Sequence, residues 1–196
     1  MLIRLLILAS FSLSAMSHSD WQLDKAQSEL SFVAIKDAHV ADNHYFTDID
    51  AHIDNQGQVR LTVNMASVQT NIARRDERLR DILFKVTGFP QAYALLNVRR
   101  SYLKPLPAGS QREIKVAGHL NMMGISQPTS ARLQVNHLAN GQVSVSTIEP
   151  ILVDSEDYGM LPGINVLTKL AGLKTISIKI PVSFNLVFNF VKVSEL

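Results

Sequence analysis

The chain of 196 residues contains no cysteine, carries 19 basic and 17 acidic side chains, and is 46% hydrophobic. A net charge of +2 does not indicate the concentrated basic face of a nucleic-acid-binding protein, and the hydrophobic fraction excludes a disordered chain. The absence of cysteine excludes a disulfide framework and thiolate metal ligands. The length is sufficient for one domain with its own core.

The N-terminus has the pattern of a secretion signal. Arg4 is the one charged residue before Asp20, and a short apolar run interrupted by serines follows Arg4. Ala15 and Ser17 are small residues at the −3 and −1 positions of a cleavage site. The run is too short for a membrane span, which needs roughly 20 residues. We expect residues 1–17 to be a cleaved signal peptide and residues 18–196 to be a single periplasmic domain without a membrane span. The alternatives for residues 1–17 are a buried strand or an uncleaved anchor.

Apolar residues recur at every second position from residue 28 onward, which is the period of a half-buried strand. The first strands are expected at 30–34, at 45–53 with Tyr45 on the apolar face, and at 59–65 after a turn at 54–57. Further strands are expected at 92–98, 114–122, 131–135 and 143–145, with Asn140-Gly141 as a tight turn.

The C-terminal part combines an irregular segment with a long apolar strand. Residues 154–172 contain Pro162 and Gly163 and are expected to be irregular, with a helical turn at 166–170. Residues 176–190 then alternate without a gap, and Pro181, which cannot donate to a sheet, predicts a bend or bulge.

Residues 67–90 interrupt the strand pattern with a strongly charged, amphipathic helix. Thr70 or Asn71 is expected to cap the helix, and Asp76 to pair with Arg80 across one turn. Leu79, Ile82 and Leu83 form the apolar stripe of this helix, opposite a face rich in arginine and acidic residues.

These elements predict an all-β fold, a closed antiparallel barrel of eight strands. The short helix falls between strands 3 and 4, and the irregular or helical segment precedes the last strand. Closure removes the unpaired edges of the sheet. A β-sandwich fits the same pattern, and an outer-membrane barrel with its apolar face toward lipid is a third alternative.

The helical segment resembles the signature of the YceI-like family, periplasmic lipocalin-fold proteins associated with polyisoprenoid binding. The matching residues are Ser67, Thr70, Arg75, Asp76, Glu77, Leu79, Arg80, Phe84, Phe89 and Pro90. The resemblance extends to Trp21, to residues 118–129 and to residues 157–159. The sequence departs from the family at three positions that are often histidine there: Gln27, Arg78 and Met123. It implies a lipocalin-like barrel that encloses an isoprenoid or isoprenoid-quinone-like lipid.

The apolar strand faces supply the expected binding residues. We expect the lumen to be lined by Phe32, Val63, Leu96, Val116, Leu120, Leu133, Ile178, Ile180, Val182 and Phe184. Arg74, Arg75, Asp76 and Arg78 are expected either to hold an anionic headgroup, since guanidinium groups match phosphate oxygens, or to clamp the helix to the barrel. The alternative is a solvated helix face on which acidic residues nearly balance the arginines.

The sequence indicates binding rather than catalysis. It contains no nucleophile-elbow or phosphate-loop motif, and its histidines lack metal-ligand spacing, with His39 and His44 expected in an irregular loop. We therefore expect no enzyme activity, cofactor or metal. The alternative function is an interaction or structural protein with a filled barrel that docks a partner through its arginine-rich helix. A homodimer is a further possibility.

Overall fold

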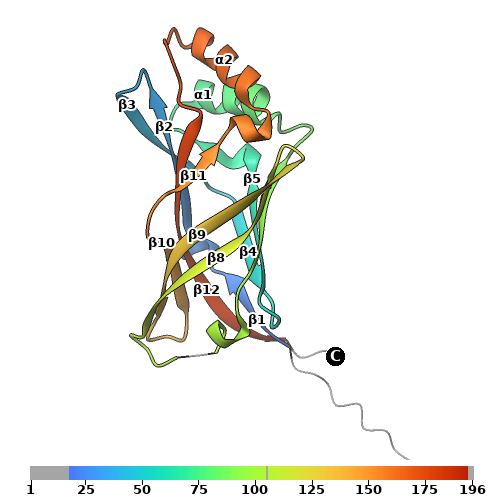
Figure 1. Ribbon diagram of the computed structural model, residues 1–196, viewed down its shortest axis with the longest axis vertical. Coiled ribbons are helices and arrows are strands. Elements are labelled where there is room, and N and C mark those ends of the chain that lie inside the picture. The colour runs from blue at the N-terminus through green and yellow to red at the C-terminus, as the bar shows by residue number, and fades with distance from the viewer. Residues whose placement is uncertain (1–17, 105, 194–196) are drawn as a thin grey trace, which may run out of the picture.

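Eight antiparallel strands close into a barrel in the order β1, β4, β5, β7, β8, β9, β10, β12 and back to β1 (Figure 1). The computed structural model describes residues 18–104 and 106–193, so the expected signal peptide lies outside the described residues. The ring consists of β1 (His18–Leu23), β4 (Ile49–Ile53), β5 (Gln58–Asn64), β7 (Gln91–Asn97), β8 (Gln111–Met122), β9 (Ile125–His137), β10 (Val143–Thr147) and β12 (Lys179–Val193). The predicted lipocalin-like barrel is confirmed, and the β-sandwich alternative is wrong because the sheet closes on itself.

The closure depends on β12, which forms hydrogen-bonded pairs along both edges. On one edge it pairs with β1 and with β2 (Glu29–Lys36), and on the other with β10 and β11 (Ile151–Asp154). The strand begins at Lys179 and continues through Pro181, which pairs with Leu152. The expectation that Pro181 interrupts the strand was wrong, because β11 pairs with β12 residue for residue through this position.

The strand predicted at 45–53 is two strands, β3 (Val40–Phe46) and β4. Thr47 and Asp48 lie between the two strands and belong to neither, and this break shifts the phase of the alternation. As a result His44 and Phe46 line the interior, whereas Tyr45 does not. The expectation that Tyr45 occupies the inner face was wrong, and so was the expectation of a loop at His44, which is a buried strand residue.

Two helical segments lie together at one end of the barrel (Figure 1). The first consists of α1 (Ala73–Arg78) and the π-helical η3 (Leu79–Phe84), between the third and fourth strands of the ring, as predicted. The second, α2 (Leu161–Leu170), precedes β12 and is longer than the predicted turn. The two pack closely at Gly163, where a Cβ atom would lie 2.8 Å from the carbonyl oxygen of Ile82.

The remaining elements are short. They are β6 (Val68–Gln69), which pairs with β3, and the 3-10 turns η1 (Lys25–Gln27), η2 (Met65–Ser67), η4 (Arg100–Tyr102) and η5 (Glu156–Tyr158).

The start of α1 differs from the prediction. Ile72 occupies the N-cap position without a side-chain hydrogen bond, so neither Thr70 nor Asn71 caps the helix. Instead the Asp76 carboxylate accepts hydrogen bonds from the Thr70 backbone N–H, at 2.8 Å, and from the Thr70 hydroxyl. Asp76 is 5% exposed, and this buried contact takes the place of the expected pair with Arg80.

We predict that Asp76→Ala lowers the free energy of unfolding by about 2–3 kcal/mol, because it leaves the buried Thr70 N–H without an acceptor. Chemical denaturation would measure the loss. The matched control is Asp81→Ala, an exposed carboxylate in the following η3 turn, which should change the free energy by less than about 0.5 kcal/mol. Equal effects of the two substitutions would contradict the clamp.

Candidate functional site

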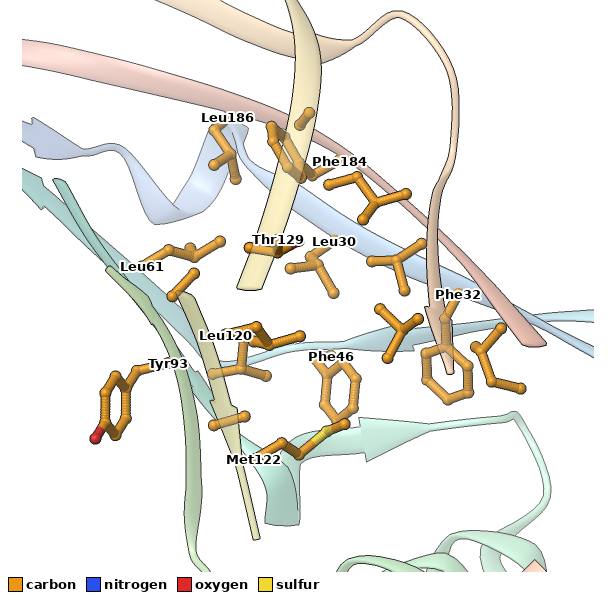
Figure 2. Close-up of a pocket in the computed structure, with 18 of the residues that line it drawn as sticks. Leu30, Phe32, Phe46, Leu61, Tyr93, Leu120, Met122, Thr129, Phe184 and Leu186 are labelled. Carbon is orange, nitrogen blue, oxygen red and sulfur yellow. The ribbon is translucent and has the colours of Figure 1, made fainter. Parts of the chain in front are cut away.

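The barrel encloses a cavity of about 630 Å³. Inward-facing side chains from all eight strands of the ring line it, together with residues of α1, η3 and α2 at one end and Tyr102 of η4 at the other. Figure 2 shows Leu30, Phe46 and Leu120 directed toward the same space, and Phe32 and Met122 lie around it. The cavity therefore extends along the inside of the barrel.

The barrel is hollow because one wall has small inward-facing residues. Ala92 and Ala94 occupy inward positions on β7, and Ala131 occupies one on β9. Across the barrel, the inward residues of β2, β3 and β12 include Phe32, Phe46 and Phe184. Phe184 packs against the cluster of Ile114, Val116 and Leu133, but the small residues leave space elsewhere, so the interior is not filled to the density of an ordinary core.

Nine of the ten residues expected to line the lumen do so: Phe32, Val63, Leu96, Val116, Leu120, Leu133, Ile180, Val182 and Phe184. Ile178 does not line the cavity. It precedes the first residue of β12, and its carbonyl oxygen accepts hydrogen bonds from the backbone N–H (2.9 Å) and the hydroxyl (2.8 Å) of Ser155. That these residues bind a ligand stays a prediction.

Every charged residue lining the cavity in the described part of the chain is basic. These residues are Lys36, Arg74, Arg75 and Arg78 at the helical end and Arg112 at the opposite end. The helical end therefore has a positive rim, formed by the first four of these side chains.

Three of the four rim cations have acidic partners. Arg74 bonds Glu77 at 3.1 Å, while Lys36 and Arg75 both bond the Asp42 carboxylate, at 2.5 and 2.9 Å. The hydrogen bond from Lys36 lowers the pKa of Asp42, and the bond from Arg75 adds to the effect. In the described residues no carboxylate lies within ion-pair distance of Arg78, which is half-buried at the cavity.

The structure divides the predicted headgroup or clamp residues into two pairs. Arg75 and Asp76 join α1 to neighbouring segments, since Arg75 donates to Asp42 of β3 and, at 2.8 Å, to the Thr70 carbonyl oxygen. Their contacts are those of a clamp. Arg74 and Arg78 instead line the rim, and among the described residues Arg78 lacks the acidic partner that Arg74 has.

His44 lies in the cavity wall and was missed as a site residue by the sequence reasoning. It is 2% exposed, its ring lies edge-on to Phe32 with centroids 5.3 Å apart, and its Nδ1 has no hydrogen-bond partner among the described residues. Burial lowers the pKa of His44, and the nearby Arg75 guanidinium lowers it further. The imidazole is therefore neutral at neutral pH. The signal in the sequence was the alternation of Asp42, His44 and Phe46.

The far end of the cavity has a different composition. The guanidinium of Arg112 lies over the Tyr102 ring, 5.0 Å from its centroid, and His137 is buried nearby. Burial lowers the pKa of His137, and Arg112 lowers it further. Aromatic and aliphatic groups cover this end, and η4 lies at the opposite end of the barrel from α1 and α2 (Figure 1).

The chemistry of the cavity suits binding. Within residues 18–104 and 106–193, no group of three or more potential metal-ligating side chains is found. In the same part of the chain, no helix has both the length and the apolar character required to cross a membrane. The long apolar cavity and its positive rim can hold an elongated apolar molecule with a polar or anionic end.

Comparison with known proteins supports the fold and the family. The model of the YceI-like domain matches residues 21–188. A polyisoprenoid binding domain from Saccharophagus degradans, implicated in plant cell wall breakdown, superimposes with a TM-score of 0.83 at 30% identity, over 86% of this chain and 97% of that one. BcnA of Burkholderia cenocepacia has the same fold, with a TM-score of 0.66 at 16% identity over 84% of this chain and 98% of its own. No curated protein matches. The chain belongs to the YceI-like family.

Proposed function

We propose that the protein is a periplasmic, non-catalytic binding protein that encloses an isoprenoid or isoprenoid-quinone-like lipid in its barrel. The observation that carries the proposal is the apolar cavity of about 630 Å³. Pockets that bind small molecules usually measure roughly 300–1,000 Å³ and are mostly apolar. The similarity to a polyisoprenoid binding domain at 30% identity supports the ligand class, and the secretion-signal pattern of residues 1–17 supports the location.

The cost of an unfilled cavity supports the same function. Side chains that face an unfilled apolar space lack van der Waals partners on that side. A ligand that fills the space supplies these contacts. The cavity also counts against the alternative of a filled barrel used only for docking.

The apolar walls supply enough free energy for binding. Burying roughly 500 Å² of isoprenoid surface contributes about 12 kcal/mol at 25 cal/mol per Å². Association costs an estimated 4–15 kcal/mol, so the low end of this range leaves about 8 kcal/mol, which corresponds to roughly micromolar affinity. No polar contact is needed for the lipid tail to bind.

The positive rim defines the orientation of the ligand. An anionic headgroup at the helical end would lie beside Arg78, which has no carboxylate partner in the described residues. The tail would then extend past Phe46 and Leu120 toward Tyr102. Arg75 and Asp76 act in this proposal as the clamp that holds α1 at the rim.

We predict that Ala94→Phe weakens binding of geranylgeraniol about tenfold or more. Ala94 lies on the wall of small residues, and a ring there occupies ligand space. Displacing even two methylene-sized groups removes about 1.6 kcal/mol of burial. Trp21 is the single tryptophan of the chain and lines the cavity. The change in its fluorescence during a titration with geranylgeraniol would measure the affinity.

The matched control is Leu95→Phe, which adds a similar ring on the outer face of the same strand, where Leu95 is 44% exposed. This variant should bind as the unaltered protein does. Unchanged affinity in Ala94→Phe, with the variant folded, would overturn enclosure of the lipid in the barrel.

We predict that Arg78→Gln weakens binding of geranylgeranyl diphosphate about fivefold and leaves geranylgeraniol unaffected. A partly exposed ion pair contributes up to about 1 kcal/mol, and only the diphosphate can form one. Arg112→Gln at the far end is the control for orientation. If Arg112→Gln impaired diphosphate binding and Arg78→Gln did not, the headgroup would lie at the opposite end.

A further inference from the structure

The cavity reaches the surface of the molecule at the helical end of the barrel. Three residues of its lining are exposed there: Ile72, Arg74 and Ala171. Ile72 is 52% exposed, so an apolar side chain of the lining faces solvent. At the opposite end of the cavity, Tyr102 is half-buried and His137 is buried. The cavity therefore has a mouth at the helical end.

Exposed aliphatic side chains continue from this mouth onto α2. Val166 and Leu170 are 44% and 49% exposed and lie one turn apart on the outer face of the helix. The inner face carries the buried Ile164 and Leu167, so α2 is apolar on both sides. Leu170 lines a groove of about 220 Å³ together with Arg78, which joins the outer face of α2 to α1. Exposed apolar groups gathered beside a pocket mark a surface that contacts a partner or a membrane.

The same end of the barrel is rich in basic residues. Residues 161–174 contain two exposed lysines, Lys169 and Lys174, and no acidic residue. Residues 72–85 contain five basic and three acidic side chains, and one of the acidic residues, Asp76, is buried. The two helical segments therefore combine a net positive charge with exposed aliphatic groups.

The opposite end of the barrel lacks this combination. Residues 98–112 contain four basic residues and no acidic one, so that end is basic as well. The large apolar side chains of this segment, Tyr102, Leu103 and Leu106, are half-buried rather than exposed. The two ends thus differ in exposed apolar surface rather than in the sign of their charge.

A bilayer of anionic phospholipids matches both properties of the helical end. Each basic side chain near an anionic membrane surface strengthens binding about fivefold. Aliphatic side chains on the surface of a helix enter the boundary between headgroups and acyl chains. An acidic protein would match the charge, but only a bilayer also supplies or receives a lipid at the mouth of the cavity.

We propose that the helical end of the barrel docks on an anionic phospholipid bilayer, with the mouth of the cavity facing the membrane. The docking surface consists of Ile72, Arg78, Val166, Lys169, Leu170 and Lys174. The inference rests on the proposed function and adds the membrane with which the lipid is exchanged. A lipid that passes through the docked mouth does not expose its tail to water, so the hydrophobic cost of transfer through water is avoided.

Sedimentation with vesicles tests the contribution of charge. The unaltered protein should bind vesicles of equal parts phosphatidylglycerol and phosphatidylcholine, and about tenfold more weakly vesicles of phosphatidylcholine alone. Lys169→Gln combined with Lys174→Gln should weaken binding to the anionic vesicles about 25-fold, because each lysine contributes about fivefold. High salt should also weaken binding, because it screens exposed charges.

A second pair of substitutions tests the contribution of apolar contact. Val166→Gln combined with Leu170→Gln should weaken binding to the anionic vesicles about tenfold, because it removes apolar surface that enters the membrane. Neither these two residues nor the two lysines line the cavity. Both double variants should therefore bind geranylgeraniol as the unaltered protein does.

The matched control is Arg99→Gln combined with Arg100→Gln, which removes the same charge from two exposed residues at the opposite end. This variant should bind the anionic vesicles as the unaltered protein does. An equal loss in the control, or no binding of the unaltered protein to the anionic vesicles, would overturn the docking surface. Failure of the unaltered protein to bind geranylgeraniol, with vesicle binding intact, would instead overturn the proposed function.

Discussion

The pairing of β12 along both of its edges closes the barrel and thereby determines the shape of its interior. Because β12 bonds β1 and β2 on one side and β10 and β11 on the other, each strand of the ring has two neighbours and the wall cannot collapse inward. The small residues Ala92, Ala94 and Ala131 then leave space that their opposite neighbours do not fill. The cavity follows from a closed backbone combined with insufficient side-chain volume.

The two ends of the barrel are built differently, and this difference gives the site a direction. At the helical end, the clamp of Arg75 and Asp76 holds α1 against β3, and the close contact at Gly163 holds α2 against η3. These contacts place the positive rim over the cavity. At the other end, Tyr102 and Arg112 cover the apolar interior. In the proposed function, this difference favours one orientation of a lipid with a polar head.

The barrel and most of the cavity wall could be predicted from the sequence, because every strand of a closed antiparallel barrel has one inner face. Apolar residues therefore recur at every second position along each strand. The prediction failed where a local break shifted the phase, as at Thr47 and Asp48, so His44 was assigned to a loop and Tyr45 to the inner face. The prediction of a helix cap failed because the tertiary fold buries Asp76, whose carboxylate accepts the hydrogen bond of the Thr70 hydroxyl. Whether the barrel was hollow could not be predicted, because volume depends on how eight inner faces combine rather than on any one strand.

Enclosure of a lipid in the barrel is tested by native mass spectrometry of the mature protein. The protein is purified from a periplasmic extract without detergent and then extracted with organic solvent. We expect a discrete added mass that disappears on extraction and returns on incubation with an isoprenoid lipid. A bare mass before extraction, and still after incubation with geranylgeraniol, squalene, menaquinone and geranylgeranyl diphosphate, would contradict it.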